Sequence, residues 1–467
     1  MQHWIRRTAG ALALSVVCAG QAASETLADA LVSAYTHSGL LDQNRALLRA
    51  ADEDVAIAVS ALRPVINWSA SFGRTLRRSN SIQTGFVTSN SASTDIEIAL
   101  VAELTLIDFG ANRLAIDAAK ESVLATRERL ISVEQQVLLR AVRAFMNVQR
   151  EAENVALRQN NLRLLRQERR AAQDRFNVGE VTRTDVSLAE ARLASAESLL
   201  ASSIGALDQA REEYAAVVGH PPGHLVAPRS LPKTASSEDA AKAIAVRTHP
   251  DMREAQRNVT VAELNILRAE AQTKPTVSLQ GRIGASESAP RRNAQQFGSI
   301  SLEASGPVYQ GGRLPALIRQ AAANRDATRG ALHNVRHAVR LNVGTAWSQV
   351  AVAQASRRAS QAQIRAARVA FEGVREEAKL GARTTLDVLD AEQELLNARA
   401  SEISAAVDEY IAAYTLLSAM GLLTVEHLNL PVQQYDPAAY YNLVKDAPGN
   451  SLQGQKLDRV LKALGKQ

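Results

Sequence analysis

The apolar and polar positions of this chain switch between two periods. From Thr26 to Leu62 the apolar positions recur as they do on one face of a helix. After Pro64 they alternate with polar positions, which predicts a strand with one apolar and one polar face. The apolar side of this first strand consists of Ile66, Trp68, Ala70 and Phe72.

Three more alternating runs follow. The second lies beyond a polar segment, Arg77 to Ser93, which predicts a loop. Its apolar side is unbroken over Ile96, Ile98, Leu100, Ala102, Leu104 and Leu106. Glu97 and Glu103 lie on its other side, so that face meets water. The third and fourth runs follow Pro275, with apolar positions at Val277, Leu279 and Ile283, then at Ile300, Leu302, Ala304 and Val308. The sequence therefore predicts two strand pairs, at about 65–107 and 276–309.

Long helices are predicted after each strand pair. From about Gly110 to Val178 the chain contains no proline and no internal glycine, and a helix of this length would span on the order of 100 Å. A second long helix is expected over about 314–380, and each is followed by a turn and a return helix. The second return helix has apolar residues every seven positions, which implies coiled-coil-like packing: Leu389, Leu396, Ile403, Tyr410 and Leu417.

The two turns share one sequence motif. Residues 179–186 read Gly-Glu-Val-Thr-Arg-Thr-Asp-Val, and residues 381–388 read Gly-Ala-Arg-Thr-Thr-Leu-Asp-Val. Gly179 and Gly381 are 202 positions apart, and the same offset carries Gly110 onto Gly312 and Gly219 onto Gly421. The chain is therefore an internal duplication of about two hundred residues, too long a period for a solenoid.

The expected organisation follows from this duplication. We predict a signal peptide over 1–24, a first repeat over 25–219, a connector over 220–236, a second repeat over 237–421 and a partly disordered tail over 422–467. The first repeat holds a hairpin tip at 179–185 and the second holds one at 381–387. The fold class is mainly helical with four strands.

The N-terminal sequence indicates an export signal, and the composition argues against nucleic-acid binding and enzymatic function. Arg6 and Arg7 precede an apolar run and the small residues Ala22-Ala23-Ser24, as in a secretory signal peptide. The only cysteine, Cys18, lies in this segment. Without the two arginines the formal charge falls from +6 to +4, which gives no case for nucleic acid. We find no nucleophile–base pair, phosphate loop or metal cluster, and so predict no enzymatic activity, metal or cofactor.

Several residues of the tips carry candidate functions. Gly179 and Gly381 end the long helices, where left-handed glycine caps are expected. Thr182 and Thr384, or the residues just after them, can cap the return helices, with an aspartate in the first turn. For Asp185 a role as a cap is as good an interpretation as a functional one.

The second tip carries an additional acid. Asp387 and Asp390 are three positions apart and share one helix face, whereas Leu188 occupies the place of Asp390 in the first copy. A cap needs one carboxylate, so the second requires another explanation.

Four alternating strands of membrane-spanning length are typical of an outer-membrane β-barrel. Every strand edge must be paired in lipid, and about eight strands are the practical minimum for closure. We therefore expect an oligomer in which each copy contributes four strands. A soluble sheet packed on the helices remains an alternative, and with it a periplasmic coiled-coil scaffold or adhesin with no transport role.

The chain resembles the TolC family of outer-membrane exit ducts over nearly its whole length. The resemblance is carried by Glu25-Thr26-Leu27, by 175–179 (Arg-Phe-Asn-Val-Gly), by 307–312 (Pro-Val-Tyr-Gln-Gly-Gly) and by 387–391 (Asp-Val-Leu-Asp-Ala). It implies a homotrimer with a twelve-stranded barrel, a helical tunnel extending into the periplasm, a periplasmic adaptor and an inner-membrane ABC or RND-type transporter. Secreted proteins and small-molecule drugs are both implied as cargo, and the sequence does not name which.

The resemblance also implies roles at the tips. Asp387 and Asp390 match aspartates that ring the tunnel entrance. Arg383 matches an arginine that ties neighbouring hairpins shut, and Thr184 and Asp185 match its partners. The family's tyrosine at another latch position is Ala378 here, so the resemblance does not supply the full set of latch bonds.

Overall fold

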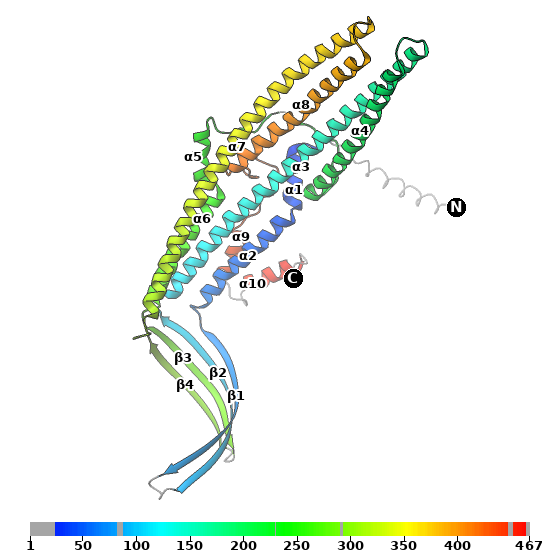
Figure 1. The fold of residues 1–467 in the computed structure, drawn as a ribbon. Helices are drawn as coiled ribbons and strands as arrows, with labels where there is room; N and C mark the ends of the chain where they lie inside the picture. The colour runs from blue at the N-terminus through cyan, green and yellow to red at the C-terminus, as the bar shows by residue number, and fades with distance from the viewer. Residues whose placement is uncertain (1–23, 82–86, 229, 290–292, 447–451, 464–467) are drawn as a thin grey trace, which may run out of the picture. The chain divides into compact units, whose positions relative to one another are not determined.

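The computed structural model describes residues 24–81, 87–228, 230–289, 293–446 and 452–463 (Figure 1). Residues 1–23, which hold the predicted signal peptide, lie outside the described residues. The chain divides into two compact units. The first comprises residues 1–44, 129–252 and 336–435, and the second comprises 45–128, 253–335 and 436–467.

Among the described residues, the second unit contains one antiparallel sheet with strand order β1-β2-β3-β4. Its strands are β1 (Val65–Ser81), β2 (Val87–Ile107), β3 (Thr276–Ala289) and β4 (Asn293–Ser305). The two predicted strand pairs are confirmed, and β2–β3 pairing joins them into one sheet. Among the described residues β1 and β4 are edge strands, each paired on one side only.

The first hairpin is longer than we predicted. Residues 77–81 and 87–93 continue β1 and β2, with Arg77 paired to Ser91 and Ser81 to Val87. The expected loop is therefore wrong over most of its length, because ladder hydrogen bonds between backbones continue where side chains become polar. The fourth strand ends at Ser305, so Val308, which we placed in it, lies outside.

The helices are α1 (Leu27–His37), α2 (Gly39–Ser60), α3 (Ala111–Asn177), α4 (Arg183–Val218), α5 (Glu238–Thr248), α6 (Pro250–Ala271), α7 (Arg313–Lys379), α8 (Thr385–Ala419), α9 (Ala439–Val444) and α10 (Leu452–Ala463). The two predicted long helices are confirmed, and α3 and α7 each have 67 residues. The single helix expected over 26–62 is instead two helices, because Ser38 adopts an extended backbone between α1 and α2.

The duplication is visible in the backbone. Each glycine pair at the offset of 202 adopts positive φ in both copies: Gly110 and Gly312, Gly179 and Gly381, Gly219 and Gly421. At the last pair, Gly219 and Gly421, the close approach of neighbouring residues also requires glycine. A Cβ on Gly219 would lie 2.5 Å from the ring of His37, and one on Gly421 would lie 2.6 Å from the Cα of His249.

The core of the first unit lies between helices. Tyr214 and Phe145 are fully buried, with ring centroids 6.5 Å apart. Of the predicted heptad in α8, Leu389, Leu396 and Leu417 are buried, which supports the coiled-coil packing. Part of the expected tail is ordered in the second unit, where the Tyr440 hydroxyl donates to Glu53 at 2.6 Å. Residues 447–451 and 464–467 lie outside the described part of the tail.

Candidate functional site

The first candidate site is formed by the tips of the α3–α4 and α7–α8 hairpins, which both belong to the first unit. Both long helices end in the same way. The Glu180 amide donates to the Arg175 carbonyl and the Ala382 amide to the Glu377 carbonyl, each at 2.9 Å around a left-handed glycine. This is a Schellman motif, and it contains the left-handed glycine caps predicted at Gly179 and Gly381.

Each return helix then begins with a capping box. The Thr182 amide donates to Asp185 Oδ2 at 3.0 Å, and the Thr384 amide donates to Asp387 Oδ2 at 2.9 Å. The side-chain and backbone hydrogen bonds from Thr182 lower the pKa of Asp185. Those from Thr384 lower the pKa of Asp387. Both aspartates therefore stay ionised, and both have a structural task at the helix start.

Asp390 has a different partner. Its Oδ1 accepts a hydrogen bond from Arg192 on α4 at 2.6 Å, so this pair joins the two hairpins of one chain. Arg192 was not among the residues predicted from sequence, because the pairing depends on how α4 packs against α8. The offset of 202 carries Arg192 onto Glu394, so the charge at this position changes sign between the two copies. This change of sign is the sequence feature that could have identified Arg192.

Arg383 points to its own hairpin. Its Nε donates to Glu377 Oε2 at 2.8 Å, which raises the pKa of Arg383. Asp185 is not its hydrogen-bond partner in the described chain, and Thr184 is exposed in the first turn of α4. Nevertheless Arg383 and Asp185 line the same cleft between the tips, which has a volume of about 640 Å³. Ala378 lines it as well.

The two walls of this cleft carry opposite charges. The first hairpin contributes Glu168, Glu180 and Asp185 together with Arg175, and the second contributes Arg375, Lys379 and Arg383. Opposite charges that face each other across a cleft attract, more strongly at low ionic strength. We will call these the acidic wall (Glu168, Glu180, Asp185) and the basic wall (Arg375, Lys379, Arg383).

The second candidate site is the sheet of the second unit. The strand register places the predicted apolar positions of the four strands on one face, apart from Leu106, where the register shifts, and Val308, which lies outside β4. These side chains are strongly exposed in the single chain, for example Trp68 at 75% and Ile300 at 84%. An apolar face of this kind in water would be unstable, so it must meet an apolar environment.

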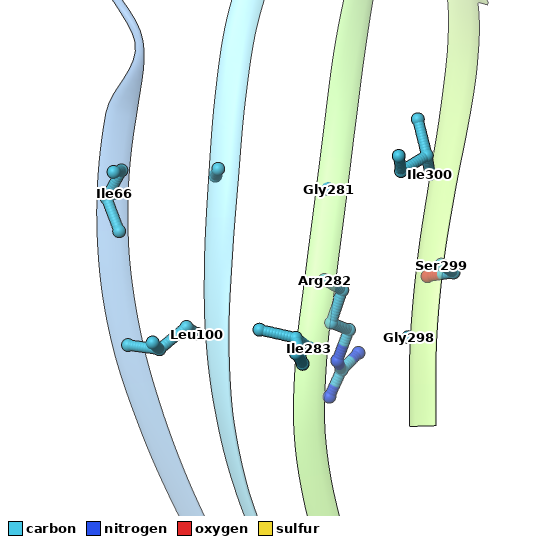
Figure 2. A pocket seen from close by; sticks show the side chains of 9 residues that line it. Ile66, Leu100, Gly281, Arg282, Ile283, Gly298, Ser299 and Ile300 are labelled. Carbon is cyan, nitrogen blue, oxygen red and sulfur yellow. The ribbon is translucent and has the colours of Figure 1, made fainter. Parts of the chain in front are cut away.

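This face is hollowed where glycines replace side chains. Ala102 pairs with Gly281, Gly281 with Ile300, and Ile283 with Gly298. The hollow measures about 710 Å³, and its labelled side chains in Figure 2 come from all four strands. The opposite face is polar, with an ion pair between Arg282 and Glu97 and a hydrogen bond from Ser288 to Asp95 at 2.6 Å.

Among the described residues, no three His, Cys, Asp or Glu side chains gather in a way that could hold a metal ion. Within the same described residues, no helix combines the length and apolarity that a membrane span needs.

Comparison with known proteins decides between the interpretations. The family model described as "outer membrane efflux protein" matches residues 30–220 and 244–422, one segment in each repeat. The chain is 36% identical to the outer membrane efflux protein BepC of Brucella suis biovar 1 (strain 1330), over 94% of both chains. This chain belongs to the outer membrane efflux protein family.

Other members of the outer membrane efflux protein family agree. The chain is 26% identical over 303 residues to the alkaline protease secretion protein AprF of Pseudomonas aeruginosa, covering 63% of each. The Campylobacter jejuni CmeC outer membrane channel shares its fold, with a TM-score of 0.75 over 90% of this chain and 89% of that one, at 17% identity. As a member of this family the chain is an outer-membrane export channel protein, and the alternative of a scaffold or adhesin is not supported.

Proposed function

We propose that this chain is one subunit of a homotrimeric exit duct, in which three copies close a twelve-stranded barrel in the outer membrane. The observation that supports this most directly is the open sheet. Its two edge strands, β1 and β4, are each paired on one side only, and its exposed apolar face requires lipid. Four strands cannot close a barrel, whereas three sets of four can.

The duct would receive cargo from an inner-membrane ABC or RND-type transporter through a periplasmic adaptor. Support for this comes from relatives named for efflux and for protease secretion. Cross-linking in cells followed by co-purification would identify the transporter and with it the class of cargo.

Mass measurement of the detergent-solubilised protein tests the trimer. We expect three chains of 50.2 kDa less the removed signal peptide. A folded protein that stays monomeric at micromolar concentration, with its sheet intact by circular dichroism, would refute the shared barrel.

We further propose that the hairpin tips form the periplasmic entrance, with Asp387 and Asp390 as its acidic ring. Threefold symmetry would bring six carboxylates to one opening, and such rings favour cations. Arg383 would tie the tips together by exchanging Glu377 for Asp185 of a neighbouring tip, a bidentate pair that a guanidinium can form.

Single-channel recording in planar bilayers tests the ring. Asp387→Ala combined with Asp390→Ala should lower the preference for cations and the block by multivalent cations. Thr384→Ala breaks the same capping box, and Arg192→Ala breaks the same ion pair, without removing a carboxylate. Wild-type selectivity in the double variant, or an equal loss in both controls, would show that these aspartates serve only the local structure.

A further inference from the structure

One buried carboxyl group near the tips forms no hydrogen bond with any of the described residues. Glu392 on α8 is 5% exposed, and neither of its carboxylate oxygens has a hydrogen-bond partner among the described residues. Its counterpart in the first repeat, Glu190, is exposed and lies 3.8 Å from Arg169. A buried carboxylate without hydrogen bonds is energetically unfavourable, so its presence at this position of the second repeat requires an explanation.

Glu392 lines a small cavity at the contact between the two hairpins. The cavity measures about 130 Å³, and most of its walls are apolar or amide side chains. They come from α3 (Leu157, Asn160, Asn161, Leu164), α7 (Phe371) and α8 (Leu395, Leu396, Arg399). A space of this size can admit water when the hairpins loosen.

The charges that face Glu392 come from every helix around it. Glu168 lies on α3, Arg375 on α7, and Arg399 on α8 lines the cavity. On α4, the Arg192 cation is bound to Asp390. Burial, and to a smaller extent the Glu168 carboxylate, together raise the pKa of Glu392 to about 7 against the opposing effect of Arg375.

A second pair of acids lies on the same two helices. Glu153 on α3 has a raised pKa because of burial and because Glu402 on α8 is close to it. Along the α3–α8 contact, acids of the first hairpin thus face acids of the second at two levels, Glu153 with Glu402 and Glu168 with Glu392. Like charges on packed helices repel when both are ionised.

We infer that Glu392 is a proton-controlled switch of the α3–α8 contact: protonated, it lets the α7–α8 hairpin pack on α3, and ionised, it pushes the two hairpins apart. Because the carboxyl is neutral only while packed, the packed arrangement binds more protons than the separated one. Packing is therefore firm below the ordinary pKa of a glutamate, weakens as the pH rises from there to about 7, and is weakest above 7. Only the consequence for the entrance rests on the proposed function, since the hairpin contact lies within one chain.

Hydrogen exchange of full-length trimer in detergent tests the contact itself, with labelling times corrected for the intrinsic effect of pH. In the wild type, protection of residues 389–399 should fall on the order of a hundredfold between pH 5 and pH 8. Glu392→Gln should keep its protection at both pH values. Glu394→Gln is the matched control: this exposed acid lies two positions away and accepts a hydrogen bond from Gln363, so it should behave like the wild type.

Substituting two charged neighbours of Glu392 should shift the midpoint of the pH profile in opposite directions. A merely structural role of Glu392 would not produce these shifts. Glu168→Gln removes a like charge, so the midpoint of the pH profile should move to lower pH. Arg375→Gln removes a favourable cation, so the midpoint should move to higher pH. A Glu392→Gln profile with the wild-type dependence on pH, or equal shifts in both neighbours, would overturn the inference.

Single-channel conductance over the same pH range separates this inference from the proposed function. If Glu392→Gln abolishes the pH dependence of exchange but conductance never depends on pH, then the switch exists and the tips are not the entrance. If conductance depends on pH equally in the wild type and in Glu392→Gln, the entrance is controlled elsewhere, which overturns the consequence for the entrance and leaves the switch to the exchange data.

Discussion

At the scale of single residues, the tips depend on a few positions whose conformation is unusual. Gly179 and Gly381 have φ near +80°, where a side chain is strained, and each is followed by the capping box of the next helix. The sequence revealed these positions because glycine, threonine and aspartate recur at the same spacing in both copies. It did not reveal the partners of Arg383 and Asp390, because those depend on the packing of neighbouring helices.

Gly381→Ala should destabilise the second tip by about 1 kcal/mol, because alanine is strained in the left-handed region. Faster hydrogen exchange in the first turn of α8 would show it. Gly373→Ala is the matched control on α7, where the added methyl group meets nothing within 4 Å. This control should be neutral or stabilising, since alanine favours helix. Equal effects of the two substitutions would contradict the assigned role of Gly381.

At the scale of elements, the sheet follows the period of two along the chain. The assignment of faces could be made from sequence alone because a strand places alternate side chains on opposite sides. The strand ends could not be predicted in this way. Residues 77–81 and 87–93 are polar except for Val87 and Ala92, so no alternation marks them, and only the continued pairing of backbones shows that they belong to β1 and β2.

The two faces of β2 should respond differently to charge. Leu100 lies on the apolar face beside Ile283, and Glu103 lies on the other face, opposite Val65 and Gln280. Leu100→Arg should cost ~2–4 kcal/mol if it is near the middle of the bilayer, and Glu103→Arg should cost little. The yield of assembled trimer in outer-membrane fractions measures the difference. Equal yields would contradict the assignment of the faces.

At the scale of the whole chain, the two repeats share one backbone and differ in charge. Each residue of the basic wall has an uncharged counterpart 202 positions earlier: Gln173 for Arg375, Asn177 for Lys379 and Val181 for Arg383. The acids Glu168 and Glu180 likewise correspond to Ala370 and Ala382. The duplication was evident from sequence, but the opposition of the two walls was not, since it needed the cleft that brings them together.

Reversing one wall should therefore open the cleft, and reversing both should close it again. Arg375→Glu with Lys379→Glu places acids opposite acids and should raise single-channel conductance. Glu168→Lys with Glu180→Lys places cations opposite cations and should likewise raise single-channel conductance. All four changes together should restore the low conductance, because the attraction returns. An open state in the fourfold variant would show that the walls act through other partners.

The charge difference between the two tips has a consequence for a closed ring. Three copies of a duplicated chain place six tips around one axis, and the two kinds must alternate. Each tip of the first repeat then has a tip of the second repeat on either side, one from its own chain and one from the next. The same complementarity that joins the hairpins within a subunit would thus also select the neighbour, and a ring built from identical halves would have no such preference. Divergence after duplication would in this way convert a sixfold backbone into a threefold electrostatic pattern.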